Sequence, residues 1–166
     1  MNIIAVIKSL LENIIFLSTV SSLFIAQVFK ILFFILHPKT KIKQLKLLET
    51  LLWRTGGMPS SHSAVVCSLA ASAGIKEGFD SNIFVISLIF AMIVLRDALG
   101  VRRSAGIQAK ALNNLGKQTA QKIEIDFHSV KEIQGHTPPE VIVGSLLGIA
   151  IAVGYYFILV NTVRFQ

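Results

Sequence analysis

The sequence is poor in the residues that soluble domains present to water. Only 15% of its 166 residues are charged, against about 25% in an ordinary soluble domain. Acidic residues are the scarcest, with 9 Asp and Glu against 16 Lys and Arg. A single cysteine, Cys67, excludes a disulfide scaffold, and the hydrophobic content of 53% excludes a disordered chain. The composition therefore indicates a small integral membrane protein, with one domain over residues 1–166.

The excess of positive charge, +7, raises the question of a polyanionic partner. The aromatic residues are mostly Phe inside apolar runs and do not alternate with Lys and Arg, so we expect no nucleic-acid partner. Anionic headgroups of the lipid bilayer and a phosphorylated membrane lipid suit the charge better. The sequence contains no signal from which an oligomeric state can be predicted.

Four apolar stretches are candidates for membrane-spanning helices, which need about 20 residues each. They lie near residues 14–36, 60–75, 82–100 and 141–163. The second is short and rich in Ser and Ala, which is typical of a helix packed inside a bundle. The fourth contains Gly144-x-x-x-Gly148, a spacing that lets two helix backbones approach closely. The predicted fold class is an all-α integral membrane bundle with about four transmembrane helices.

The segments outside these stretches are polar or amphipathic. Met1 to Asn13 is apolar around Lys8 and Glu12, and it either lies in the membrane interface or extends the first span. Helix formers between Ala105 and Lys122 predict a surface helix in the last connection. Eleven of the 16 Lys and Arg residues fall in the connections 37–59 and 101–139. Because positive loops stay inside, we expect both connections in the cytoplasm and both termini outside.

A first polar cluster, from Gly56 to Ser63, begins the second apolar stretch. It contains Gly57, Ser60, Ser61 and His62. Free backbone N–H groups at a helix N-terminus favour an anion, and neighbouring hydroxyls add donors, so we expect phosphate binding here. The alternative is that Ser60 only caps the helix.

A second cluster, Asp97, Arg102 and Arg103, follows the third apolar stretch. Guanidinium groups bind phosphate oxygens through paired, planar donors. The alternative is that the Arg pair only anchors the topology. A carboxylate at the membrane boundary is costly unless it is paired, so we expect Asp97 to orient an Arg.

The third cluster, His136 and Glu140, begins the fourth apolar stretch. Residues four apart are neighbours on a helix, and a carboxylate bound to one imidazole nitrogen leaves the other as a nucleophile or base. The alternative is structural, because Thr137-x-x-Glu140 is a capping box and Pro138 suits the first helical position. We expect the two roles to be only partly compatible, since one carboxylate serves both.

The predicted topology places all three clusters at the cytoplasmic face. Such a set fits phosphoryl transfer through a phosphohistidine, in which one histidine attacks phosphorus and the other protonates the leaving oxygen. Neither His62 nor His136 has a third metal ligand at a suitable spacing, so we expect no metal and no other cofactor.

The motifs Gly-Met-Pro-Ser-Ser-His62-Ser-Ala, Gly-Val-Arg102-Arg103-x-Ala-Gly and Gly-His136-x-Pro-x-Glu140-Val occur in this order. Together they resemble the divergent branch of the type 2 phosphatidic acid phosphatases, a superfamily that also contains the vanadium haloperoxidases. The resemblance implies that His62 is the general acid, that His136 is the nucleophile and that Glu140 orients it. It also implies that the serine at position 60 and nearby backbone amides hold phosphate.

The chain departs from the family pattern in several places. Ser61 stands where the family has Gly, Glu140 where it has Asp, and Val130 where an Arg precedes the nucleophile by six residues. A Lys-x6-Arg-Pro element is also missing, since Lys46 and Arg54 are one residue too far apart. Arg102 and Arg103 are then expected to take over phosphate binding.

The resulting prediction is a membrane phosphatase that hydrolyses a lipid phosphate or pyrophosphate. We expect it in the cell membrane if the source is a bacterium, with its active site on the cytoplasmic face. The alternative is a non-catalytic membrane protein that binds or moves a phosphorylated lipid.

Overall fold

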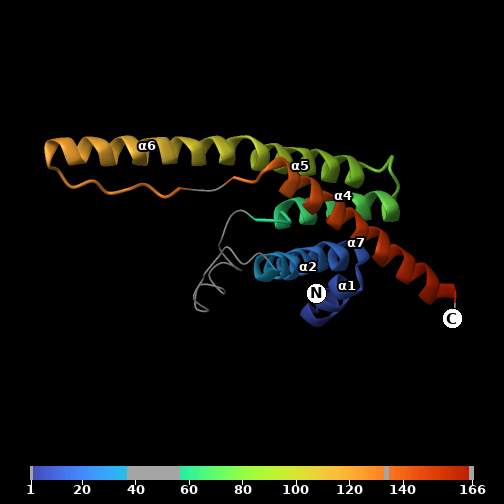
Figure 1. Cartoon of the computed structure of the whole chain (residues 1–166). Helices are drawn as coiled ribbons and strands as arrows, with labels where there is room; N and C mark the ends of the chain where they lie inside the picture. The colour runs from blue at the N-terminus through green and yellow to red at the C-terminus, as the bar shows by residue number, and fades with distance from the viewer. Residues whose placement is uncertain (1, 37–56, 133–134, 165–166) are drawn as a thin grey trace.

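The computed structural model describes residues 2–36, 57–132 and 135–164. The predicted basic connection at 37–56, with Lys46 and Arg54, lies outside the described residues. Most of the described residues are helical, and none of them lies in a strand. The helices are α1 (Ile3–Glu12), α2 (Ile14–Leu36), α4 (Ser61–Glu77), α5 (Asn82–Leu99), α6 (Val101–Ile123) and α7 (Pro138–Arg164) (Figure 1).

Helix α4 is the centre of the bundle and packs against α2, α5 and α7 (Figure 1). Its buried side chains are almost all small, which lets three neighbouring helices approach its backbone. They are Ser61, Ser63, Ala64, Val66, Ser68, Ala70, Ser72, Ala73 and Gly74. The Ser72 hydroxyl donates to the Ser68 carbonyl oxygen at 2.7 Å, so it is satisfied within its own helix.

The contact between α7 and α4 depends on two glycines one helical turn apart. A Cβ atom at Gly144 would overlap the carbonyl oxygen of Ser60, and one at Gly148 would overlap that of Ala64. This is the close backbone approach that the Gly-x-x-x-Gly spacing predicts. It places the first turn of α7 beside the first turn of α4.

Within the part of the chain that the structure describes, three helical stretches are long and apolar enough to cross a membrane, namely Ile14–Phe33, Asn82–Ile123 and Pro138–Ile158. They overlap the first, third and fourth of the predicted spans. Helix α4 occupies the predicted second span, but with 17 residues it is not one of these three stretches. The count of four spans therefore stays a prediction.

Helix α1 is separate from α2 and does not extend it. The Asn13 side chain accepts hydrogen bonds from the backbone N–H groups of Ile15 at 2.9 Å and Phe16 at 3.3 Å, so it caps the start of α2. Figure 1 shows α1 folded back beside α2. Its residues are exposed throughout, which fits the interfacial alternative.

Helix α6 confirms the predicted surface helix and is longer than expected. It follows α5 in nearly the same direction and projects beyond the bundle (Figure 1). Residues 124–132, the return segment, run back alongside α6 (Figure 1). The side chain of Asn113 binds the return segment to α6. Its amide donates to the Val130 carbonyl oxygen and its oxygen accepts from the Val130 N–H, both at 2.9 Å. Phe127 covers Gly116.

The return segment brings the start of α7 back to the start of α6. At Gly135 a Cβ atom would overlap the backbone of Arg103. Only glycine permits this approach, and it brings the third polar cluster against the second.

Candidate functional site

The three polar clusters lie together at one end of the bundle. The Ser60 N–H donates to the Glu140 carbonyl oxygen at 3.0 Å, which joins the start of α4 to the first turn of α7. The rings of His62 and His136 have centroids 6.5 Å apart. Together with the contact of Gly135 on Arg103, these contacts bring residues more than 70 positions apart in the sequence to one place.

His136 and Glu140 form the most defined part of this site. His136 Nδ1 lies 3.0 Å from Glu140 Oε2, and the same oxygen accepts from the Thr137 backbone N–H at 3.1 Å. A carboxylate oxygen has two lone pairs, so one atom serves the histidine and the helix cap at once. The two roles expected to be only partly compatible therefore hold together. A proton on Nδ1 for Glu140 leaves the lone pair on Nε2.

His62 lies in the first turn of α4, outside the three spanning stretches, and is partly exposed. Desolvation by its surroundings is the largest influence and lowers its pKa below the ordinary value of 6.5. The positive charges of Arg102, His136 and Lys30 lower the pKa further, and Asp97 acts in the opposite direction. A bound phosphate would also raise it, since an anion favours the protonated ring.

Asp97 is paired with an arginine, and that arginine is Arg102. The Arg102 Nε donates to Asp97 Oδ2 at 2.6 Å, between two half-exposed side chains. This bond uses one edge of the guanidinium, whose terminal amino groups are further donors. The backbone of Arg103 lies against Gly135.

The residues of the first cluster differ in how far they are buried. Ser60 is fully buried, and its hydroxyl accepts from the Ser63 N–H at 3.4 Å and the Ser63 hydroxyl at 2.9 Å. It therefore caps α4, as the alternative interpretation expects. Ser61 is also buried, whereas Gly57 is exposed with a φ of +96°. Phosphate binding by these three residues stays a prediction.

Lys30 of α2 belongs to this end of the bundle, although it lies outside the three motifs. A Cβ atom at Gly57 would lie 3.0 Å from Lys30 Cε, and the Lys30 charge acts on His62. The sequence does contain a signal for Lys30, because a cation inside an apolar stretch is costly and usually functional. Among the described residues, no three His, Cys, Asp or Glu side chains gather as a metal site requires.

Comparisons with known proteins agree with the motifs. The sequence model of the Divergent PAP2 family matches residues 11–151, a range that contains every site residue named above. The uncharacterized membrane protein YuiD of Bacillus subtilis (strain 168) is 38% identical over 161 residues, covering 89% of this chain and 98% of the relative. No solved structure matches the chain significantly. The chain has apolar helices and three polar motifs that meet at one end of the bundle. It is a membrane protein that belongs to the Divergent PAP2 family.

Proposed function

We propose that this protein is a phosphatase that hydrolyses a lipid phosphate or pyrophosphate through a phosphohistidine. The observation that carries the proposal is the bond between His136 Nδ1 and Glu140 Oε2, with the His62 ring nearby. A carboxylate on one ring nitrogen holds the imidazole in the tautomer that a nucleophile needs. A second imidazole at 6.5 Å is near enough to act on the other side of a phosphoryl group held between them.

The proposed reaction has two halves. In the first, the Nε2 lone pair of His136 attacks phosphorus and a P–N bond forms as the bond to the leaving oxygen breaks. Protonated His62 gives its proton to that oxygen. In the second, His62 takes a proton from water, the water oxygen attacks phosphorus, and the P–N bond breaks. Inorganic phosphate leaves, and His136 returns to its neutral form.

Positive groups surround the proposed phosphate position. Arg102 and Lys30 both act electrostatically on His62, so a phosphate beside that ring would lie within their field. Asp97 holds the Arg102 guanidinium, which limits the cost of ordering it. The helix starts at Ser61 and Pro138 add partial positive charge at the same end of the bundle.

The site is proposed to open to the cytoplasm, where lipid phosphates arise in biosynthesis. Six of the 16 Lys and Arg residues lie in the connection 101–139, five of them in the described helix α6. Such a bias favours the cytoplasmic side. Candidate substrates are phosphatidic acid, phosphatidylglycerol phosphate and polyprenyl pyrophosphate.

A second candidate is a non-catalytic protein that binds or moves a phosphorylated lipid. The burial of the site favours it, because His136 is only 5% exposed and Ser60 is completely buried. A nucleophile needs access to phosphorus, whereas a binding protein needs only the charges around it.

Phosphate release from a panel of lipid phosphates in detergent distinguishes the two candidates. We expect wild-type protein to release phosphate from at least one member, and His136→Ala to abolish release. The matched control is His128→Ala, because His128 is exposed on the return segment beside α6. Saturable binding without release from any substrate would contradict the phosphatase and support the binding protein.

A further inference from the structure

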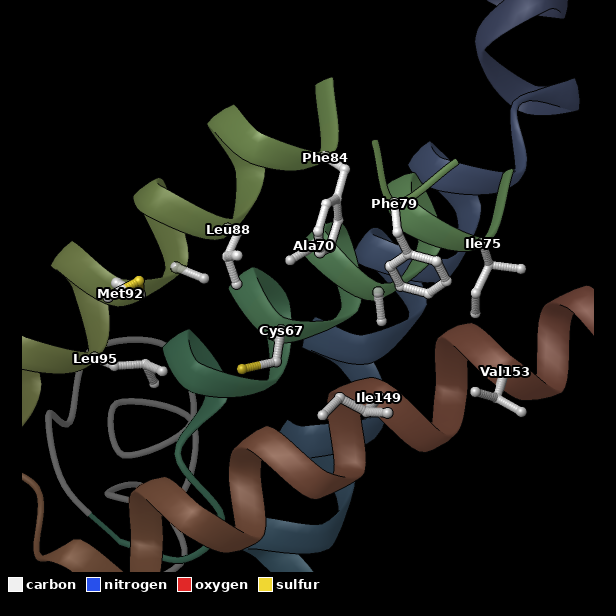
Figure 2. Close-up of a pocket in the computed structure, with 12 residues that line it drawn as sticks. Cys67, Ala70, Ile75, Phe79, Phe84, Leu88, Met92, Leu95, Ile149 and Val153 are labelled. Atoms are coloured by element: carbon white, nitrogen blue, oxygen red, sulfur yellow. The ribbon is translucent and has the colours of Figure 1, made fainter. Parts of the chain in front are cut away.

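An apolar groove with a volume of about 470 Å³ lies on the surface of α4, between α5 and α7. Helix α4 packs against both neighbours, whereas α5 and α7 contact each other little, so the gap between them leaves one face of α4 uncovered. The volume falls within the range of about 300–1,000 Å³ that is typical of small-molecule sites. Figure 2 shows the side chains that line it.

One face of each helix lines the groove. On α4 the lining residues are Cys67, Ala70, Ala71 and Ile75, on α5 they are Phe84, Leu88, Ala91, Met92 and Leu95, and on α7 they are Ile149 and Val153. Phe79, in the turn between α4 and α5, completes the set. The alanines make the groove deep, and none of these side chains carries a charge. A hydrocarbon chain is the ligand that suits such a surface.

The two ends of the groove differ. At one end lie Cys67, five residues after His62, and Leu95, two residues before Asp97, so this end is one or two helical turns from the polar site (Figure 2). At the other end, Phe79 and Phe84 meet edge to face with centroids 5.1 Å apart.

The Phe pair is fixed in place by Gly74. A Cβ atom there would lie 2.7 Å from Phe79 Cε1 and 2.9 Å from Phe84 Cδ2. The rings therefore rest directly on the backbone of α4 at the far end of the groove. Along α4 the lining residues from Cys67 to Ile75 span a rise of about 12 Å.

We propose that this groove binds one hydrocarbon chain of the phosphorylated lipid whose headgroup lies at His62 and His136, and that Phe79 and Phe84 limit the length of that chain. The inference deepens the proposed function and rests on it. The position of one end of the groove, one or two helical turns from the polar site, favours this occupant over a bulk lipid. Because lipid tails are as apolar as the groove, the selectivity comes from its shape and from the attached phosphate.

The single cysteine provides a direct test, because Cys67 lines the groove and is half-buried. Its alkylation by N-ethylmaleimide is followed in a sterol-based detergent, whose rigid tail does not imitate an alkyl chain. We expect dodecyl phosphate to slow the labelling at least fivefold. Ethyl phosphate has the headgroup without the chain, and dodecanol has the chain without the headgroup, so neither should protect at the same concentration. Equal protection by dodecanol, or no protection by any probe, would overturn the proposal.

Two groove variants test the same idea through chain-length preference. Ala71→Phe fills the groove, so it should remove the protection by dodecyl phosphate, whereas Ala150→Phe on the exposed face of α7 should keep it. Phe84→Ala opens the far end and should shift the preference toward longer alkyl phosphates, even if Ala71→Phe fails to fold. An unchanged preference in Phe84→Ala would contradict the role of the Phe pair.

The outcomes separate this inference from the proposed function. Protection of Cys67 by long-chain phosphates without turnover of any phosphate would support the groove and contradict the phosphatase. Turnover with no protection and no dependence on chain length would support the phosphatase and contradict the groove.

Discussion

At the scale of single residues, the site depends on one oxygen atom with two tasks. Glu140 Oε2 accepts from His136 Nδ1 and from the Thr137 N–H, so it holds the His136 ring and the helix start together. The shared atom explains why a pattern that reads as a capping box is also the orienting element of a histidine. The two roles can be separated by chemistry, because only one of them needs the negative charge.

Glu140→Gln tests this separation. The amide oxygen still accepts from the Thr137 N–H, so the free energy of unfolding should change by less than about 1 kcal/mol. The stabilising charge beside His136 is lost, so kcat should fall by about 10²- to 10⁴-fold. Phosphate release and thermal unfolding in detergent give the two numbers, with Glu77→Gln at the other end of α4 as the control. A kcat equal to that of the control would show that Glu140 is only a cap.

The lowered pKa of His62 predicts the pH dependence of the reaction. Protonated His62 is the proposed acid, and in the free protein it is populated only below its lowered pKa, so kcat/KM should fall as pH rises through a value under 6.5. In His62→Asn the rate should fall and this decline should disappear.

The leaving group provides the control for His62. An aryl phosphate whose phenol is already acidic needs little protonation, so His62→Asn should slow its hydrolysis far less than that of an alkyl phosphate. Equal losses on both substrates would contradict the role of His62 as a general acid.

Some features of the site could be predicted from the sequence and others could not. The motifs identified His62, His136 and Glu140, and the structure brings these three together. A sequence motif does not show how deeply a side chain is buried, so the burial of Ser60 could not be foreseen. Lys30 lies on another helix, and its position near His62 depends on how α2 packs against α4.

At the scale of helices, the position of the site depends on how closely α7 approaches α4. Gly148→Ala forces a methyl group against the Ala64 carbonyl oxygen, so it should lower the free energy of unfolding by about 1–3 kcal/mol. The matched control is Gly154→Ala on the same helix, where a Cβ atom meets nothing within 4 Å. That variant should be neutral or stabilise by up to about 1 kcal/mol, because alanine is the better helix former. Equal effects of the two variants would contradict the packing.

Helix ranges were largely predictable because apolar length is a direct signal. The predicted stretches 14–36 and 82–100 correspond to α2 and α5 within one residue. The direction of α6 was not predictable, because Gly100 reads as a helix end and yet α6 begins at the next residue. The return segment could not be foreseen either, since it depends on Asn113 pairing with a backbone 17 residues away.

At the scale of the whole molecule, the uneven charge predicts the sidedness of the site. In a Cys67→Ser background, Ser104→Cys labels the exposed start of α6, and Asp80→Cys labels the turn between α4 and α5. A membrane-impermeant thiol reagent on intact cells should reach position 80 and spare position 104, because the basic connections stay inside. Lysed cells, in which both positions should react, are the control. Labelling of position 104 alone in intact cells would reverse the orientation.

The proposed phosphohistidine intermediate has a direct test. Purified protein is mixed with a lipid phosphate radiolabelled at phosphorus, and the reaction is stopped within one turnover in alkaline detergent, where phosphohistidine is stable. We expect up to one phosphoryl group per chain on the peptide that contains His136, and none in His136→Ala. Turnover by the wild-type protein without a phosphoryl group on His136, or labelling that persists in His136→Ala, would contradict it.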